Sequence, residues 1–266
     1  MRPSPHVPPA LVALMRGERL VVAAVLVALT ILSWLYLALV ADAMSAMRAG
    51  ESSAYMWLMP MGRWGPTEFV LCFAMWSLMM IAMMVPSAAP MLFAFHALDR
   101  SRPAGAAARR LSAFLLGYLL VWSTFSVVAA AVQWWLHEAA VVTDMMISSS
   151  RLFDGVVLLC AGLYQFMPAK SRCLSKCRTP MGFLLTEWRE GIWGALIMGV
   201  RHGAFCVGCC WALMALLFVG GVMNLVWIAL LAGAVLSEKV VPFGAIVAKA
   251  TGLAMCSSGL WFLFTA

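Results

Sequence analysis

The sequence predicts an all-α, polytopic helical membrane protein with about seven transmembrane helices, on the basis of its composition and its long apolar runs. Of its 266 residues, 64% are hydrophobic and 11% are charged, whereas a soluble domain is about half apolar and about a quarter charged. The apolar runs are continuous rather than alternating, and several approach the roughly 20 residues that a helix needs to cross the hydrocarbon core. Helices satisfy their own backbone hydrogen bonds there, where lipid cannot.

Seven apolar runs follow one another along the chain. In order they cover residues 20–40, 69–95, 111–136, 151–167, 197–220, 224–237 and 247–264. We expect residues 1–266 to form a single integral membrane domain, with residues 1–19 as a proline-rich, disordered cytoplasmic tail. The segment Ala41-Asp42-Ala43 resembles a signal cleavage site, but the run before it exceeds the roughly 7–15 apolar residues of a signal peptide. We therefore expect an uncleaved first span, with cleavage after Ala43 as the alternative.

Positively charged residues indicate the orientation, because cytoplasmic loops carry an excess of Lys and Arg. With seven spans, one side of the membrane holds the N-terminus and the loops after the second, fourth and sixth spans. This side carries Arg2, Arg16, Arg19, Arg100, Arg102, Arg109, Arg110, Lys170, Arg172, Lys176, Arg178, Arg189, Lys239 and Lys249. The other side carries Arg48, Arg63 and Arg151. We therefore expect the N-terminus inside and the C-terminus outside, and this asymmetry explains the net charge of +7 without a nucleic-acid partner.

The fifth span carries the densest set of metal-binding side chains, in the run Met198-Gly-Val-Arg-His202-Gly-Ala-Phe-Cys206-Val-Gly-Cys209-Cys210. A helix turns about 100° per residue, so Met198, His202, Cys206 and Cys209 share an arc of roughly 80°, with Cys210 about 40° beyond it. Thiolates and thioethers favour Cu(I), while imidazole with thiolate suits copper or zinc. Reactive side chains at membrane depth are functional-site candidates by default.

The alternative for this span is helix packing. Cysteine behaves as a small hydrophobe in many cores, and Gly199-x-x-x-Gly203 is a motif of close helix contact. Three cysteines and one histidine within nine residues nevertheless favour the metal site over packing alone.

The second span offers thioethers along one helical face. Its sulfur-bearing residues, spaced by three or four, are Cys72, Met75, Met79 and Met83, followed by Met84. Pro86 and Pro90 remove backbone donors, so we expect a break in this helix, and such breaks often mark ion sites in transporters. A methionine stripe at helical spacing also fits an ordinary core. Met79, Met83 and Met84 are therefore second-site candidates.

The cytoplasmic loop after the fourth span holds the pair Cys173-Leu-Ser-Lys-Cys177. Two thiols on one helical turn can bind one soft ion, and neighbouring Arg172, Lys176 and Arg178 would favour thiolates. Two reduced surface cysteines are the alternative.

Three other segments have weaker patterns. The outer-loop run Met56-Trp-Leu-Met59-Pro-Met61 could capture Cu(I) or lie at the lipid interface. His96, near the inner end of the second span, could approach the fifth. Glu238-Lys239, at the inner turn, is expected to be a solvated pair.

No nucleotide-binding or hydrolase motif occurs, and no span carries paired carboxylates for a proton relay. The sequence therefore names no enzymatic activity and no energy source for transport. Two other functions stay open. One is a membrane thiol–disulfide oxidoreductase that uses Cys206 and Cys209 as a Cys-x-x-Cys pair. The other is a non-catalytic subunit of a larger membrane complex with protein partners.

Several blocks between about residue 69 and the C-terminus also occur together in one known family. They are Ala82-Met-Met-Val-Pro-Ser-Ala-Ala-Pro90, Cys173-x-x-x-Cys177-Arg-x-Pro180, His202-Gly-x-x-Cys206-x-Gly-Cys-Cys-Trp-Ala-Leu-Met214, Gly221-Val-Met-Asn224 and Glu238-Lys239. With them the chain resembles an uncharacterised bacterial family of predicted metal-binding integral membrane proteins. The resemblance implies metal binding, without an established metal, and the bacterial inner membrane as the location.

Taken together, these patterns predict a soft-metal-binding membrane protein that acts in metal delivery, tolerance or passage, with Cu(I) ahead of zinc. The bilayer and the metal ion are its expected partners, and protein partners in a membrane complex are open. The expected primary ligands are His202, Cys206, Cys209 and Cys210, with Met198 on the same stripe. The expected second-site ligands are Met79, Met83 and Met84, and Cys173 and Cys177 are expected to exchange metal with the cytoplasm.

Overall fold

The computed structural model describes residues 9–55, 65–99, 102–141, 143 and 148–265. Within these ranges the chain forms helices and no β-strand, which confirms the all-α prediction. The helices are α1 (Pro9–Arg48), α2 (Pro66–Leu98), α3 (Ala104–Glu138), α4 (Arg151–Tyr164), α5 (Pro168–Arg178), α6 (Pro180–Glu187), α7 (Gly191–Ala215), α8 (Leu217–Gly220), α9 (Leu225–Val240) and α10 (Gly244–Phe264). Because α1 begins at Pro9, helix extends into the segment 1–19 that was expected to be a disordered tail.

Five described stretches are long and apolar enough to cross a membrane: Arg19–Met47, Pro66–Leu98, Gly105–Glu138, Gly191–Gly220 and Gly244–Phe264. A sixth arises if α4 and α5, which are bent by 64° at a short break, count as one span. The remaining predicted span corresponds to α9, whose 16 residues extend for roughly 24 Å at about 1.5 Å per residue. This is less than the roughly 30 Å of a typical hydrocarbon core.

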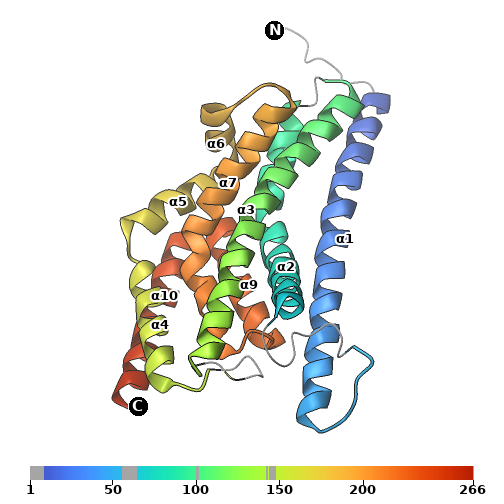
Figure 1. Ribbon diagram of the computed structural model, residues 1–266. Helices are drawn as coiled ribbons and strands as arrows, with labels where there is room; N and C mark the ends of the chain where they lie inside the picture. The colour runs from blue at the N-terminus through green and yellow to red at the C-terminus, as the bar shows by residue number, and fades with distance from the viewer. Residues whose placement is uncertain (1–8, 56–64, 100–101, 142, 144–147, 266) are drawn as a thin grey trace.

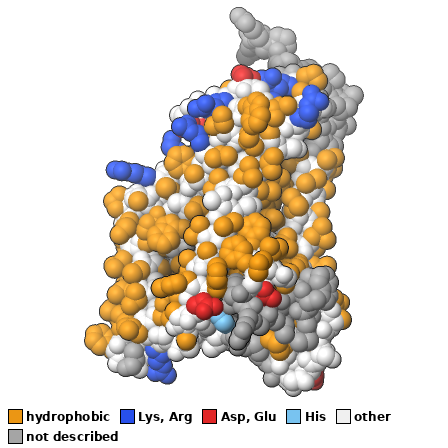
Figure 2. Space-filling view, in the orientation of Figure 1, with side chains coloured by type: hydrophobic (Ala, Val, Ile, Leu, Met, Phe, Trp, Pro, Cys, Tyr) orange, Lys and Arg blue, Asp and Glu red, His pale blue; other side chains and the backbone are white. Residues whose placement is uncertain are grey.

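The helices alternate in direction (Figure 1). We call the end of the bundle where α1, α3 and α7 begin the upper end; α2 runs back toward it, while α4 and α9 rise from the lower end to mid-height, and α10 descends. In the same orientation, Figure 2 shows hydrophobic side chains over most of the visible face, with Lys and Arg gathered mainly along its upper part.

Glycines allow two helix pairs to pack at close range. A Cβ atom at Gly199 of α7 would collide with the carbonyl oxygen of Phe114 in α3, and one at Gly117 would collide with that of Leu196. Gly203 lies one turn further along the same contact, where an added Cβ would be 3.0 Å from the Cβ of Val121. The packing role considered for Gly199-x-x-x-Gly203 is therefore confirmed.

The helices α4 and α10 also pack at close range through glycines. A Cβ at Gly162 would lie 2.6 Å from the sulfur of Cys256, and one at Gly259 would lie 2.8 Å from the backbone nitrogen of Leu159. These contacts, together with those of α3 and α7, are the most extensive between helices.

The expected break in the second span is wrong, because α2 runs without interruption through Pro86 and Pro90. The backbone near these prolines has side-chain partners instead. The hydroxyls of Tyr118 and Ser87 both donate to the carbonyl oxygen of Met84, at 3.2 and 2.9 Å. Neither proline removes the helical donor of Met84, because the carbonyls that lose a donor are those of Ala82 and Pro86. The Tyr118 bond therefore adds a contact that ties α2 to α3 beside the prolines.

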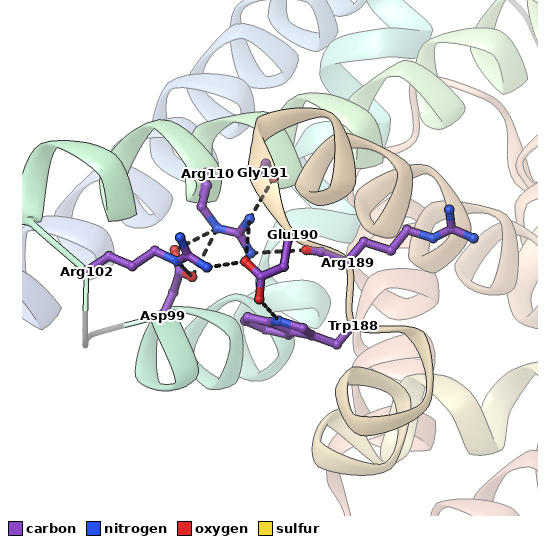
Figure 3. A network of polar contacts seen from close by, with 7 residues as sticks. All are labelled: Asp99, Arg102, Arg110, Trp188, Arg189, Glu190 and Gly191. Atoms are coloured by element: carbon purple, nitrogen blue, oxygen red, sulfur yellow. Dashed lines mark hydrogen bonds and ion pairs between the residues drawn. The ribbon is translucent and has the colours of Figure 1, made fainter.

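A polar network joins α2, α3 and α7 at the upper end (Figure 3). The buried carboxylate of Asp99 pairs with the buried guanidinium of Arg110 at 3.0 Å, and Arg110 also donates to the carbonyl oxygen of Gly191 at 2.6 Å. Arg102 pairs with both Asp99 and Glu190. Removing one partner of a buried ion pair typically costs about 3–5 kcal/mol, so this network fixes how the three helix ends meet.

Candidate metal site

The predicted stripe of α7 faces the core. The side chains of Met198, His202, Cys206, Cys209 and Cys210 are at most 2% exposed. Their helix is flanked by α3, whose close approach through the glycines was described above, and by α2, α5 and α9. The sulfur atoms of α7 are therefore surrounded by protein and not by lipid.

Cys206 is the residue on which most polar contacts converge. Its sulfur lies 3.1 Å from the hydroxyl of Tyr118 and accepts a hydrogen bond of 2.9 Å from the ammonium nitrogen of Lys239. The same ammonium group donates to the hydroxyl of Ser87, also at 2.9 Å. Side chains from α3 and α9 thus meet at one cysteine of α7, and Ser87 of α2 is joined to it through Lys239.

Two further thiols lie on the next turn of α7. The thiols of Cys209 and Cys210 donate to the backbone carbonyl of Cys206, at 3.1 and 2.9 Å. The sulfur of Cys210 also lies 3.9 Å from the thioether sulfur of Met84 in α2. This contact brings one of the three second-site candidates into the α7 cluster.

The cysteine pair of α5 reaches the same place. The 64° bend between α4 and α5 turns α5 against α7, and the thiol of Cys177 contacts those of Cys206 and Cys209. Cys173 lies beside Gly208, where an added Cβ would be 2.8 Å from the Cys173 sulfur. Of the pair predicted to lie in a cytoplasmic loop, Cys177 therefore joins the sulfur cluster and Cys173 lies beside it, and both are half-buried.

The expectation that Glu238 and Lys239 form a solvated pair is wrong. Both side chains are buried, at 1% and 7% exposure. Glu238 pairs with the equally buried Lys170 of α5 at 2.6 Å, which leaves Lys239 directed at Cys206 and Ser87. Sequence reasoning missed Lys239 as part of the site, although an ionisable residue next to an apolar run is a recognised signal of function.

His202 lies one turn before Cys206 and has an aromatic surrounding. Its ring packs among those of Phe114, Tyr118 and Phe183, with centroids 6.0, 5.6 and 5.5 Å away. Its Nδ1 atom is buried without a hydrogen-bond partner, so a lone pair or proton at this position is unused by the described residues.

The other candidate residues either are buried in the protein or lie outside the described residues. Met79 and Met83 of α2 and Met198 of α7 lie in the hydrophobic core of the protein. His96 is buried near the end of α2. The run containing Met56, Met59 and Met61 lies outside the described residues.

The donor set is soft, which is the chemical property that fits a copper ion. Four thiols and one thioether converge, from Cys177, Cys206, Cys209, Cys210 and Met84. Thiolates and thioethers select Cu(I), whereas carboxylates and water suit harder ions. In the described part of the chain, no three His, Cys, Asp or Glu side chains already have the geometry of a metal site, so binding requires the thiols to turn from their carbonyl acceptors toward the ion.

A comparison with known families agrees with this chemistry. The model of a family described as copper chaperone, named PpoB2, matches residues 73–262. No curated protein and no solved structure matches the chain. The matched segment runs from α2 into α10 and includes every residue of the sulfur cluster. Since the match covers well over half of the chain, the protein belongs to the PpoB2 family of copper chaperones.

Proposed function

We propose that the protein is an integral membrane chaperone that binds Cu(I) at the buried sulfur cluster and hands it on. The observation that carries this proposal is the meeting of sulfur atoms from α2, α5 and α7 around Cys206. Bundles build metal sites from side chains on facing helices, and one helix alone cannot surround an ion. The copper-related family supports the choice of metal.

In this proposal the ligands fall into three groups. Cys206, Cys209, Cys210, Cys177 and Met84 hold the ion in the cluster. His202 and Met198 extend the α7 stripe toward the upper end, and Cys173 accompanies Cys177 on α5. Met79 and Met83 form the second site along α2.

The proposed topology has seven spans, with the N-terminus inside and the C-terminus outside. The alternating directions of α1, α2, α3, α4, α7, α9 and α10 support this count (Figure 1). The short helices α4 and α9 then serve as the two additional spans. The gathering of Lys and Arg at the upper part of the molecule supports a cytoplasmic upper end (Figure 2). A bacterial inner membrane is the corresponding location.

The test is Cu(I) binding by protein purified in detergent under anaerobic conditions, measured against a competing Cu(I) chelator. We expect stoichiometric binding by the natural protein and none by the double variant Cys206→Ser plus Cys209→Ser. The matched control is Cys160→Ser, because Cys160 is an exposed cysteine of α4, and it should bind as the natural protein does.

Two results would overturn the proposal: a natural protein that binds no Cu(I), or a double variant that keeps full affinity. All eight cysteines are free in the structure. A stoichiometric disulfide between Cys206 and Cys209 in freshly isolated membranes would instead support a thiol–disulfide oxidoreductase. Stable co-purification with partner proteins and no metal would support a subunit of a larger complex.

A further inference from the structure

Lys239 is a buried cation whose adjacent carboxylate is already paired. Glu238 is bonded to Lys170 at 2.6 Å, so its charge is balanced by another residue. The ammonium group of Lys239 is directed instead at the sulfur of Cys206 and at the neutral hydroxyl of Ser87. Its positive charge therefore lies directly beside the sulfur cluster.

The charge of Lys239 can balance the charge of a metal ion bound by thiolates. Cysteines bind metal ions as thiolates, so a Cu(I) ion held by two thiolates forms a unit with a net charge of −1. An uncompensated charge in a buried environment is costly. The ammonium group of Lys239 would make the Cu(I) dithiolate neutral overall.

We propose that Lys239 sets the charge selectivity of the sulfur cluster and favours monovalent soft cations, Cu(I) and Ag(I), over divalent Zn(II). This inference rests on the proposed Cu(I) site. For any given set of thiolates, the complexes of a monovalent and a divalent ion differ by one positive charge at the metal position. The positive charge of Lys239 repels that additional charge. Removing the charge of Lys239 therefore raises the affinity for the divalent ion relative to the affinity for the monovalent ion.

The expected change in selectivity between Cu(I) and Zn(II) follows from the distance between Lys239 and the bound ion. A metal–thiolate bond of about 2.3 Å and the 2.9 Å between Lys239 Nζ and Cys206 Sγ together place the ion about 4–5 Å from the ammonium group. Two unit charges at this separation, at an effective dielectric constant of about 20, interact strongly enough to change a binding ratio by roughly 300- to 1,000-fold. Selectivity should change by about that factor.

The experiment compares Cu(I) and Zn(II) affinities of the full-length protein in detergent, each measured with a metal-specific competing chelator. Lys239→Gln removes the charge but keeps a donor for Ser87 and Cys206, while Lys239→Arg keeps the charge. Lys249→Gln is the control, because Lys249 is an exposed lysine of α10. We expect the ratio of Cu(I) to Zn(II) affinity to fall by roughly 300-fold or more in Lys239→Gln and to be retained in Lys239→Arg and Lys249→Gln.

An unchanged ratio in Lys239→Gln, in a protein that still binds Cu(I), would overturn this inference and leave the proposed function intact. Absence of Cu(I) binding by the natural protein would overturn the proposed function itself. If Lys239→Gln does not fold, Lys239→Met, which keeps an unbranched side chain and removes the charge, is measured in its place. A fall in the ratio of Cu(I) to Zn(II) affinity in Lys239→Met supports the inference, and an unchanged ratio contradicts it.

Discussion

The sulfur atom of Cys210 in α7 lies 3.9 Å from that of Met84 in α2, across a fully buried interface. Two metal–sulfur bonds of about 2.3 Å each can join sulfur atoms up to about 4.6 Å apart. One ion could therefore contact both residues with little movement of either helix. This geometry makes α2 a participant in the cluster and allows its contribution to be tested separately.

Replacing Met84 with leucine should weaken Cu(I) binding without unfolding the protein. Leucine keeps the volume and removes the thioether, and volume-conserving core changes usually cost less than about 1.5 kcal/mol. We expect a loss in affinity of about tenfold, the lower end of the range for changes around metal ligands. Met80→Leu is the control, because Met80 is an equally buried methionine of α2 outside the proposed ligand set. Equal affinities in both variants would remove Met84 from the site.

Replacing Gly199 with alanine should destabilise the protein. The new Cβ would collide with the backbone carbonyl of Phe114, which cannot move away without separating α3 from α7. Overpacking of this kind typically costs about 1–3 kcal/mol. Gly233→Ala is the matched control, since an added Cβ there in α9 meets nothing within 4 Å and alanine is the better helix former. Thermal unfolding in detergent should show a lower midpoint for Gly199→Ala alone; equal midpoints would refute the packing argument.

The polar network at the upper end of the bundle should stabilise the protein less in acid than at neutral pH. The indole of Trp188 donates to the carboxylate of Glu190, and Arg102 and Arg110 attract it, so the pKa of Glu190 lies below its ordinary value of 4.5. A lowered folded-state pKa stabilises the protein above the unfolded value, and this contribution disappears as the pH falls through the folded value. The effect is small, because this carboxylate is exposed.

The measurement is the unfolding midpoint between about pH 7 and about pH 3.5 for the natural protein and for Glu190→Gln. The variant should be slightly less stable near neutral pH and should lose less stability on acidification. If the two acid profiles are parallel, the interactions of Glu190 do not contribute to stability.

The proposed topology predicts where reporter fusions are active. A reporter that works only outside the cytoplasm should give signal at the C-terminus and none at Arg109, near the start of α3. The physical reason is that an odd number of spans puts the ends of the chain on opposite sides. Signal at Arg109 would reverse the orientation, and silence at both positions would indicate an even number of spans.

Helical periodicity alone explains which parts of this site a sequence can predict. Cys206, Cys209 and Cys210 share one face because a helix turns by about 100° per residue, and the spacing of Gly199 and Gly203 likewise follows from one helix. Periodicity thus predicts a shared stripe from local structure alone. The structure shows that this stripe faces the interior.

The contacts between helices depend on geometry that no single helix encodes. Cys177 meets Cys206 because α5 turns by 64° after α4, and no residue spacing specifies that angle. Lys239 has the sequence pattern of a loop lysine, and only the packing of α9 against α2 and α7 buries it. The bond from the Tyr118 hydroxyl of α3 to the carbonyl oxygen of Met84 in α2 likewise depends on how the two helices pack.

The bend between α4 and α5 is what brings α5 to the sulfur cluster. Replacing Cys177 therefore tests whether the metal site requires α5. Cys177→Ser preserves shape and removes the soft donor that contacts Cys206 and Cys209. We expect Cu(I) affinity to fall by at least about tenfold, measured with the same competing chelator as before, because a site of fewer thiolates holds the ion less firmly.

The size of this loss distinguishes two arrangements of the site. If Cys177 is a ligand, Cys177→Ser should bind Cu(I) more weakly than Cys160→Ser although both proteins stay folded. If α5 merely covers the cluster, Cys177→Ser should bind Cu(I) as tightly as Cys160→Ser does. Equal affinity in these two variants would place the whole site on α7 and α2, and α5 would then contribute burial and the Lys170–Glu238 pair but no ligand.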